Sequence, residues 1–254
     1  FMPSIECMEQ TEKKVPKKMI KLCSEYQENV FHPSFGDEEP WGKATVRFIH
    51  PKMINASMND ISLCMLITLG KFQTLLTGDA SAKVEAMLCE TVKSELRSPV
   101  MKVGHHGSNT STDDTFVKKV SPRCAVISCG TNKNFKFPHA KVVETLQRNN
   151  VILYCTKDHG NVTYTSDGKT MTVECERNKE KTEIDLQEYW RDVGETVTEV
   201  KSNKTREVNV KEEKTEGCCV GNPPTLVVEK KVDLTKSRNL IIAAVIFVSG
   251  LGFS

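Results

Sequence analysis

The sequence lacks the local signatures of several common kinds of site. It has no C-x-x-C pair among its 10 cysteines, so the ligand spacing of a zinc ribbon is absent. It has no Gly-rich phosphate loop and no G-x-S-x-G nucleophile elbow. The chain also has no large excess of positive or negative charge, because its net charge is only +2. The charge balance therefore gives no electrostatic argument for nucleic acid or for an acidic substrate.

A disulfide framework and a signal peptide are likewise not indicated. Several cysteines lie in apolar runs such as "SLCML" and "CAVISC", which is typical of small buried hydrophobic residues. This favours a reducing compartment. The chain begins at Phe1 without a charged start and an apolar run, and we interpret it as part of a longer protein.

Composition divides the chain into three parts. Residues 1–175 alternate apolar runs with turn signals and predict a folded domain. Residues 176–238 are highly charged and poor in aromatic side chains, so we expect a disordered linker, with one short helix in "EIDLQEYWRDV". Residues 239–254 carry no charge and predict a membrane anchor that the sequence cuts short; a buried strand or helix is the alternative. Basic residues before this tail favour a cytoplasmic side for the main body, and a cytoplasmic protein without an anchor is the other expectation.

The first part predicts strands and helices in alternation. "KATVRFIHP" is typical of a strand, and "ISLCMLITLGKFQTLLTG" of a hairpin that turns at Gly70-Lys71. Apolar residues recur at helical spacing in "SAKVEAMLCETVKSEL". A second hairpin is predicted at Asp167-Gly168. This alternation indicates a layered α/β domain, with residues 45–175 in a mixed sheet covered by helices.

Three predicted strand ends carry side chains that could bind a metal. In "TLLTGDA" a strand ends at Asp79, in "MKVGHHGS" the next core strand ends with His105 and His106, and "NKNFKFPHA" places His139 just before a helix. Carboxylate and imidazole groups are ligands of borderline divalent metals, and neighbouring strand ends can bring them together. Each residue also has an ordinary explanation, because a lone aspartate often caps a helix and a lone histidine in a loop is often solvated.

The order of these motifs resembles the later part of the metallo-β-lactamase fold. The branch it resembles most is the DNA-uptake competence protein ComEC and its small soluble relatives. The matching residues occur in the same order as in that branch; they are Asn59, Ser62, Leu76 to Asp79, His105 to Ser108, Ser128 to Gly130, and Pro138-His139. The resemblance covers about residues 10–175.

The resemblance implies roles for six residues. Asp79 matches the carboxylate that usually bridges two metals, and one of His105 and His106 matches a late histidine ligand; we favour His105 because it directly follows the strand. His139 matches a further histidine. Substrate contacts are implied in the next loop, at Ser108 and Asn109. The implied cofactors are divalent metal ions, with Zn²⁺ the default and Mn²⁺ the alternative.

The resemblance also implies a four-layer αββα sandwich, of which this chain holds about half. The early H-x-H-x-D-H motif of the fold, or its H-x-D-x-D-H form, is absent from all 254 residues. Phe137 stands where relatives often have another histidine. We therefore expect a metal-dependent hydrolase that activates a water molecule. Its expected substrate is a small molecule or a phosphodiester, and nucleic acid is one such phosphodiester. This chain alone should be nearly inactive.

Two other hypotheses stay open at this point. The chain could be a membrane-anchored binding module that keeps the fold without metals, or a plain α/β domain whose motif match is accidental. The accidental match predicts that Asp79 and the two adjacent histidines do not cluster in a structure.

Overall fold

A computed structural model describes residues 1–9, 17–26, 30–50, 56–131 and 135–194 of the chain. The apolar tail and most of the expected linker lie outside these ranges. Among the described helices, none has the length and apolar character needed to cross a membrane.

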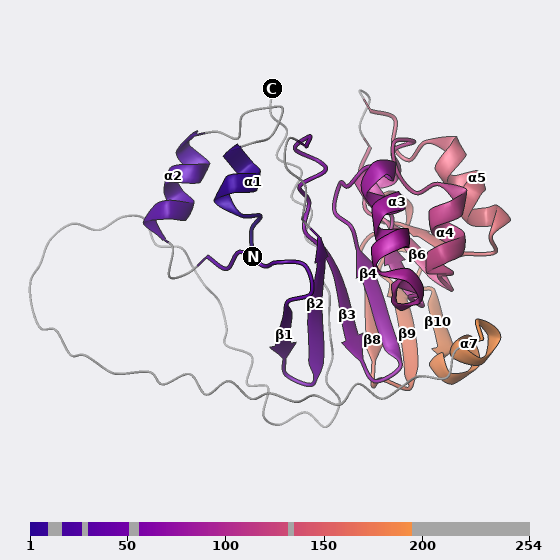
Figure 1. Cartoon of the computed structure of the whole chain (residues 1–254). Helices are drawn as coiled ribbons and strands as arrows, with labels where there is room; N and C mark the ends of the chain where they lie inside the picture. The colour runs from indigo at the N-terminus through magenta and orange to yellow at the C-terminus, as the bar shows by residue number, and fades with distance from the viewer. Residues whose placement is uncertain (10–16, 27–29, 51–55, 132–134, 195–254) are drawn as a thin grey trace, which may run out of the picture.

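The larger sheet has seven strands in spatial order β1-β2-β3-β4-β5-β6-β7 (Figure 1). Neighbouring strands from β1 to β4 are antiparallel, and those from β4 to β7 are parallel. The bounds of the strands are β1 (Glu38–Trp41), β2 (Ala44–His50), β3 (Cys64–Leu69), β4 (Phe72–Leu76), β5 (Val100–Lys102), β6 (Cys124–Ile127) and β7 (Ile152–Cys155). The parallel half places the ends of β4, β5 and β6, which carry the candidate site, along one edge of the sheet.

Three helices cover one face of this sheet (Figure 1). They are α3 (Ala82–Thr91), α4 (Asp114–Val120) and α5 (Ala140–Arg148). A short helix, η2 (Lys93–Leu96), continues α3. Buried side chains of these helices, Leu88 and Phe116 among them, pack against strand residues such as Met101. Each parallel strand needs a crossover, because the chain must return to the same end of the sheet before the next strand begins, and these helices make the crossovers and cover the sheet.

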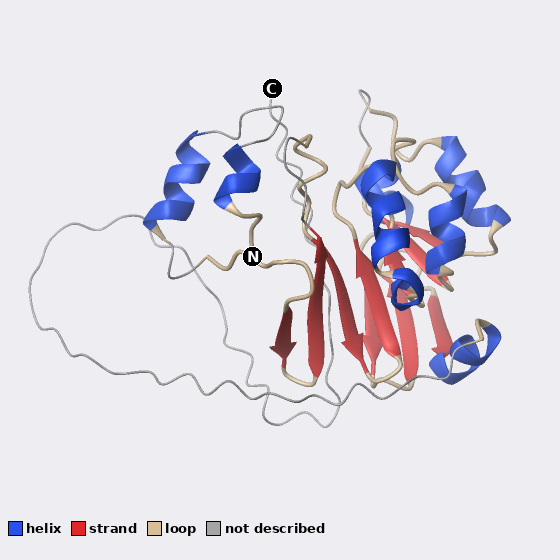
Figure 2. Cartoon of the chain, viewed as in Figure 1, coloured by secondary structure: helices blue, strands red, loops and turns tan. Residues whose placement is uncertain are grey.

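A second, three-stranded sheet lies on the opposite face, where Figure 1 labels its strands and Figure 2 shows the same view coloured by secondary structure. Its order is β10-β9-β8, with β8 (Val162–Ser166), β9 (Thr170–Cys175) and β10 (Lys181–Asp185), all antiparallel. Alternate residues of β9 point inward, because Met171 and Val173 are buried against Phe48 and Tyr154 of the larger sheet. The described residues thus form three layers: helices, the larger sheet and the smaller sheet.

Both predicted hairpin turns are confirmed, and they contact each other. β3 and β4 are joined at Gly70-Lys71, and β8 and β9 at Asp167-Gly168. Asp167 Oδ1 accepts hydrogen bonds from the backbone N–H groups of Lys169 and Thr170, which fixes the second turn. The N–H of Lys71 donates to the carbonyl of Gly168 at 2.7 Å, so the two sheets are joined at this end.

The folded part extends beyond residue 175, where we expected the linker to begin. β10 pairs with β9 over five residues, and α7 (Leu186–Asp192) follows it. Asp185 caps α7, because its side chain accepts from the N–H groups of Gln187 and Glu188. The indole N–H of Trp190 donates to the carbonyl of Lys71 at 2.7 Å. Residues 176–194 are therefore packed against the domain, because a few buried aromatic contacts offset the charged composition of this stretch.

Three further short helices lie outside the layers described above. α1 (Ile5–Glu9) and α2 (Lys17–Glu25) lie beside the end of the sheet that carries β1 and β2 (Figure 1), and α6 (Thr156–His159) follows β7. Met8 and Cys23 form a small apolar cluster with Ile61. The predicted mixed α/β class is confirmed.

Candidate functional site

The loop after β4 presents Asp79. Gly78 has φ of +58°, and a Cβ there would lie 2.9 Å from Cβ of Ser62, so the close approach of Ser62 requires glycine. The N–H of Asp79 donates to the Ser62 hydroxyl at 3.1 Å. Ser62 thus fixes the backbone from which the Asp79 side chain projects.

The two histidines lie on a short turn, η3 (Gly104–Gly107), directly after β5. His105 and His106 both have left-handed backbone conformations, with φ of 43° and 55°. The N–H of His105 donates to the carbonyl of Gly78 at 3.0 Å, which joins this turn to the Asp79 loop. The turn continues to Gly107 (φ +82°), where a Cβ would lie 2.7 Å from Cβ of Pro138.

His106 is the histidine that faces Asp79. Its Nε2 lies 3.6 Å from Oδ1 of Asp79, and its Nδ1 lies 2.7 Å from the carbonyl oxygen of Ser128. A carbonyl only accepts, so Nδ1 must carry the proton. In the neutral ring, Nε2 then presents a lone pair toward the carboxylate. Two acceptors that face each other in this way could share a cation.

The spacing of Asp79 and His106 fits two ligands of one metal ion. With bonds of about 2.0–2.1 Å in tetrahedral geometry, two ligand atoms lie about 3.3 Å apart. A hydrogen bond from the second ring nitrogen to a backbone carbonyl is also usual for metal-bound histidine. However, within the described residues no group of three or more His, Cys, Asp or Glu side chains is arranged to hold a metal. The described part of the chain brings together two donors of such a set.

The other two expected ligands, His105 and His139, are engaged differently. Nδ1 of His105 lies 3.1 Å from the hydroxyl of Thr110. Burial lowers the pKa of His105, and the Asp79 charge partly opposes this effect. Nδ1 of His139 accepts from the N–H of Asn109 at 2.9 Å, and its Nε2 lies 3.2 Å from the Phe135 carbonyl. His139 therefore uses both ring nitrogens to hold neighbouring backbone.

The two expected substrate contacts differ in exposure. Ser108 is buried, and its hydroxyl lies 3.0 Å from the hydroxyl of Thr110. Asn109 is exposed on the same loop. Asn109 is therefore the one of the two that faces solvent.

Phe137 occupies the space among the three histidines. Its ring centroid lies 6.0 Å from that of His105, 6.1 Å from that of His106 and 5.2 Å from that of His139. The phenyl ring covers one side of the histidine cluster with apolar surface. Phe137, which departs from the motif that the sequence otherwise resembles, thus lies beside the candidate ligands.

Two charged residues support the site and were not among the expected ones. Lys102 is buried at the end of β5; burial lowers its pKa, and the charge of Asp79 acts in the opposite direction. Glu85 is buried on α3, and burial raises its pKa to about 8. Oε2 of Glu85 accepts from the N–H of Thr112, whose hydroxyl accepts from the N–H of Gly104. The sequence signals were a lone lysine in "PVMKVG" and a lone carboxylate beside the apolar Val84.

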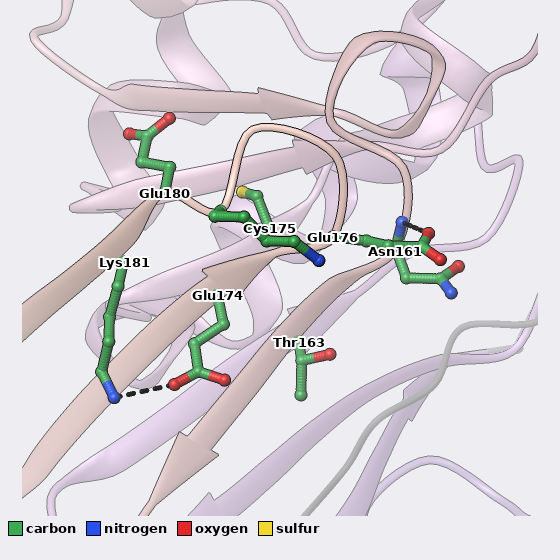
Figure 3. A pocket seen from close by; sticks show the side chains of 8 residues that line it. Asn161, Thr163, Glu174, Cys175, Glu176, Glu180 and Lys181 are labelled. Carbon is green, nitrogen blue, oxygen red and sulfur yellow. Dashed lines mark hydrogen bonds and ion pairs between the residues drawn. The ribbon is translucent and has the colours of Figure 1, made fainter.

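An open pocket of about 400 Å³ lies elsewhere, where β8, β9 and β10 meet (Figure 3). Glu174 pairs there with Lys181 at 2.8 Å, and Glu176 accepts from the N–H of Asn161. The pocket is lined by Asn161, Thr163, Glu174, Cys175, Glu176, Lys179, Glu180 and Lys181. None of the six candidate site residues lines it.

Comparison with known proteins finds relatives among competence proteins. The chain is 36% identical over 109 residues to ComE operon protein 3 of Bacillus subtilis. It is 37% identical over 114 residues to Recombination protein 2 of Haemophilus influenzae, and 32% identical over 117 residues to Competence protein ComA of Neisseria gonorrhoeae. These alignments cover 43%, 44% and 46% of this chain.

The chain spans only a small part of these relatives, because the alignments cover 14%, 14% and 17% of their lengths. No family model matches the chain. The relatives fit the ComEC-type competence family that the sequence motifs resemble.

Proposed function

We propose that this chain contributes part of a metal-dependent hydrolase centre of the metallo-β-lactamase type, and that the centre acts on phosphodiesters such as DNA during DNA uptake. Two of the relatives, by name, are a competence protein and a recombination protein, which supports a nucleic-acid substrate. We also propose that the three described layers belong to a four-layer sandwich. The observation that carries the proposal is the pairing of Asp79 with His106.

The described ligands have distinct roles in this proposal. Asp79 would serve as the carboxylate ligand, because it projects from a loop end and its side chain is 40% exposed. His106 is the histidine ligand through Nε2, in preference to His105, because its Nδ1 is held by Ser128. Zn²⁺ is the default ion for this donor pair and Mn²⁺ the alternative. When bound, such an ion lowers the pKa of a water molecule and stabilises developing negative charge.

The surrounding residues orient the ligands and the substrate. Ser128 fixes the ring of His106, and the chain of hydrogen bonds from Glu85 through Thr112 holds the start of the histidine turn. Asn109 is exposed on the loop that follows the histidine turn and can contact a phosphate oxygen. Further metal ligands must come from outside the two described donors, because a catalytic zinc site needs three protein ligands.

Isothermal titration calorimetry with Zn²⁺ tests this proposal. The whole chain should bind Zn²⁺ in the micromolar range or more weakly, since it offers only part of a ligand set. Replacement of His106 or Asp79 by alanine should weaken binding at least about tenfold, whereas His32→Ala, at a histidine outside the site, should leave it unchanged. Tight stoichiometric binding that survives both site substitutions would show that the metal lies elsewhere.

A metal-free binding module is the second candidate. It is favoured by Phe137, which stands among the histidines, and by the absence of a three-ligand cluster within the described ranges. This candidate predicts no Zn²⁺ binding that depends on Asp79 or His106. It predicts instead that a short DNA strand binds in the presence of a metal chelator and that Asn109→Ala weakens that binding.

A further inference from the structure

Two thiols meet beside the loop that holds His106. The sulfur atoms of Cys129 and Cys155 lie 3.3 Å apart, and both cysteines are free. Cys129 directly follows Ser128, whose carbonyl accepts from His106. Cys155 ends β7 and lies opposite Ile127 of β6. The pair is therefore one residue away from the group that orients the candidate metal ligand.

The surroundings of Cys155 favour its thiolate. Its sulfur accepts hydrogen bonds from the Cys129 thiol and from the backbone N–H groups of Lys157 and Asp158, which together lower its pKa below that of an ordinary thiol. The hydrogen bond that the Cys129 thiol donates to Cys155 raises the pKa of Cys129. Cys64 and Cys124 differ, because burial alone dominates and raises their pKa values.

We propose that Cys129 and Cys155 form a reversible redox pair, and that their disulfide changes how the Ser128 carbonyl holds His106. The oxidant is a peroxide. The Cys155 thiolate attacks the O–O bond of hydrogen peroxide and becomes a sulfenic acid, releasing hydroxide that is protonated to water. The Cys129 sulfur then attacks the Cys155 sulfur, the S–O bond breaks, and the leaving hydroxide takes the Cys129 proton as water. A dithiol reductant reverses the change by thiol–disulfide exchange.

Closing the disulfide moves the loop rather than the strand. A disulfide bond is about 2.05 Å long, so the sulfur atoms must approach by about 1.2 Å. Cys155 is held in the ladder between β6 and β7, whereas Cys129 lies beyond the end of β6. The backbone of Cys129 is held by one side chain, since the Thr156 hydroxyl donates to its carbonyl and accepts from its N–H. A shift of Cys129 carries the Ser128 carbonyl with it, because the two share a peptide unit.

The effect of this shift on metal binding rests on the proposed function, but the disulfide and the change at His106 do not. A ligand histidine whose second nitrogen loses its partner is less well oriented, and such losses typically lower metal affinity 10–100-fold. Oxidation should therefore weaken Zn²⁺ binding by roughly tenfold or more.

The first measurement is thiol mapping on the whole chain. The reduced protein is treated with hydrogen peroxide, labelled with two alkylating reagents of different mass before and after reduction, and digested for mass spectrometry. Cys129 and Cys155 should be recovered as a linked pair. Cys155→Ser and Cys129→Ser should each abolish the link, and Cys89→Ser, at a half-buried cysteine on α3, should retain it. If no link forms, or if the two sulfurs oxidise no faster than Cys89, the redox pair is refuted.

The second measurement follows the ring nitrogens of His106 by NMR in the reduced and oxidised protein. The Nδ1 resonance should shift on oxidation, return after reduction, and stay constant in Cys155→Ser. A linked pair with an unchanged His106 resonance would overturn the coupling. If the link forms and the resonance shifts while neither state binds Zn²⁺, the redox inference stands and the proposed metal function fails.

Discussion

His106 and Asp79 face each other at 3.6 Å between Nε2 and Oδ1, while the other nitrogen of His106 donates to the carbonyl of Ser128. These three groups follow three neighbouring strands, β4, β5 and β6. The parallel half of the sheet brings their ends together, and the hydrogen bond to Ser128 selects the ring tautomer that aims a lone pair at the carboxylate. This arrangement is the basis of the proposal that Asp79 and His106 bind a metal ion.

The turn that carries the histidines should depend on Gly107. Gly107 has a positive φ, which side chains disfavour, and a Cβ there would also clash with Pro138. Gly107→Ala should therefore lower the free energy of unfolding by about 1–3 kcal/mol in a urea titration. Gly36→Ala is the matched control, because Gly36 has φ of +90° and a Cβ there would have no neighbouring atom within 4 Å. Equal losses in the two variants would mean that the contact with Pro138 is unimportant.

Glu85 should make stability depend on pH. Burial raises its pKa to about 8, so the folded state keeps a proton that the unfolded state releases above its ordinary pKa near 4.5. The folded state binds more protons in this window, and its stability should therefore fall as the pH rises from 5 to 8, with a limiting slope of about 1.4 kcal/mol per pH unit from this group.

Glu85→Gln isolates this effect, because the amide does not titrate. The stability of the variant relative to the unchanged protein should rise steadily between pH 5 and pH 8 in urea titrations at several pH values. A difference that stays constant across this range would show that Glu85 is already ionised in the folded protein.

The packing of α7 should contribute substantially to stability. Trp190 is 8% exposed and donates to the carbonyl of Lys71, so Trp190→Ala should cost about 3–5 kcal/mol in thermal or urea unfolding. Tyr26→Ala, at an aromatic residue that is 56% exposed, should change stability by less than about 0.5 kcal/mol. A loss of less than about 1 kcal/mol at Trp190 would mean that residues 176–194 are not part of the cooperative fold.

The sequence predicted the structure correctly where local residue chemistry determines it. The turns at Gly70 and Gly168 were predictable because glycine after a strand has few alternatives. The alternation of apolar runs also predicted the α/β class. The short helix expected in "EIDLQEYWRDV" is present as α7, but the edge strand β10 was missed, because a highly charged stretch has little apolar periodicity to detect.

The side-chain orientations and contacts within the site could not be predicted from the sequence, for a different reason. The orientations of His105 and His106 depend on two consecutive left-handed residues, which no periodicity reveals. The contacts of Cys129 with Cys155 and of Ser128 with His106 join residues more than 20 positions apart. Such contacts follow only from strand order and register.

The most direct test of the central claim is an NMR titration of the histidine ring nitrogens with Zn²⁺. The proposed site predicts that Nε2 of His106 shows the largest shift, that Nδ1 of His106 stays protonated, and that Asp79→Asn removes the response. His32 and His159 serve as internal controls and should change little. A response centred on His105 or His139 instead, with His106 unaffected, would contradict the assignment of His106 and Asp79 as the metal-binding pair.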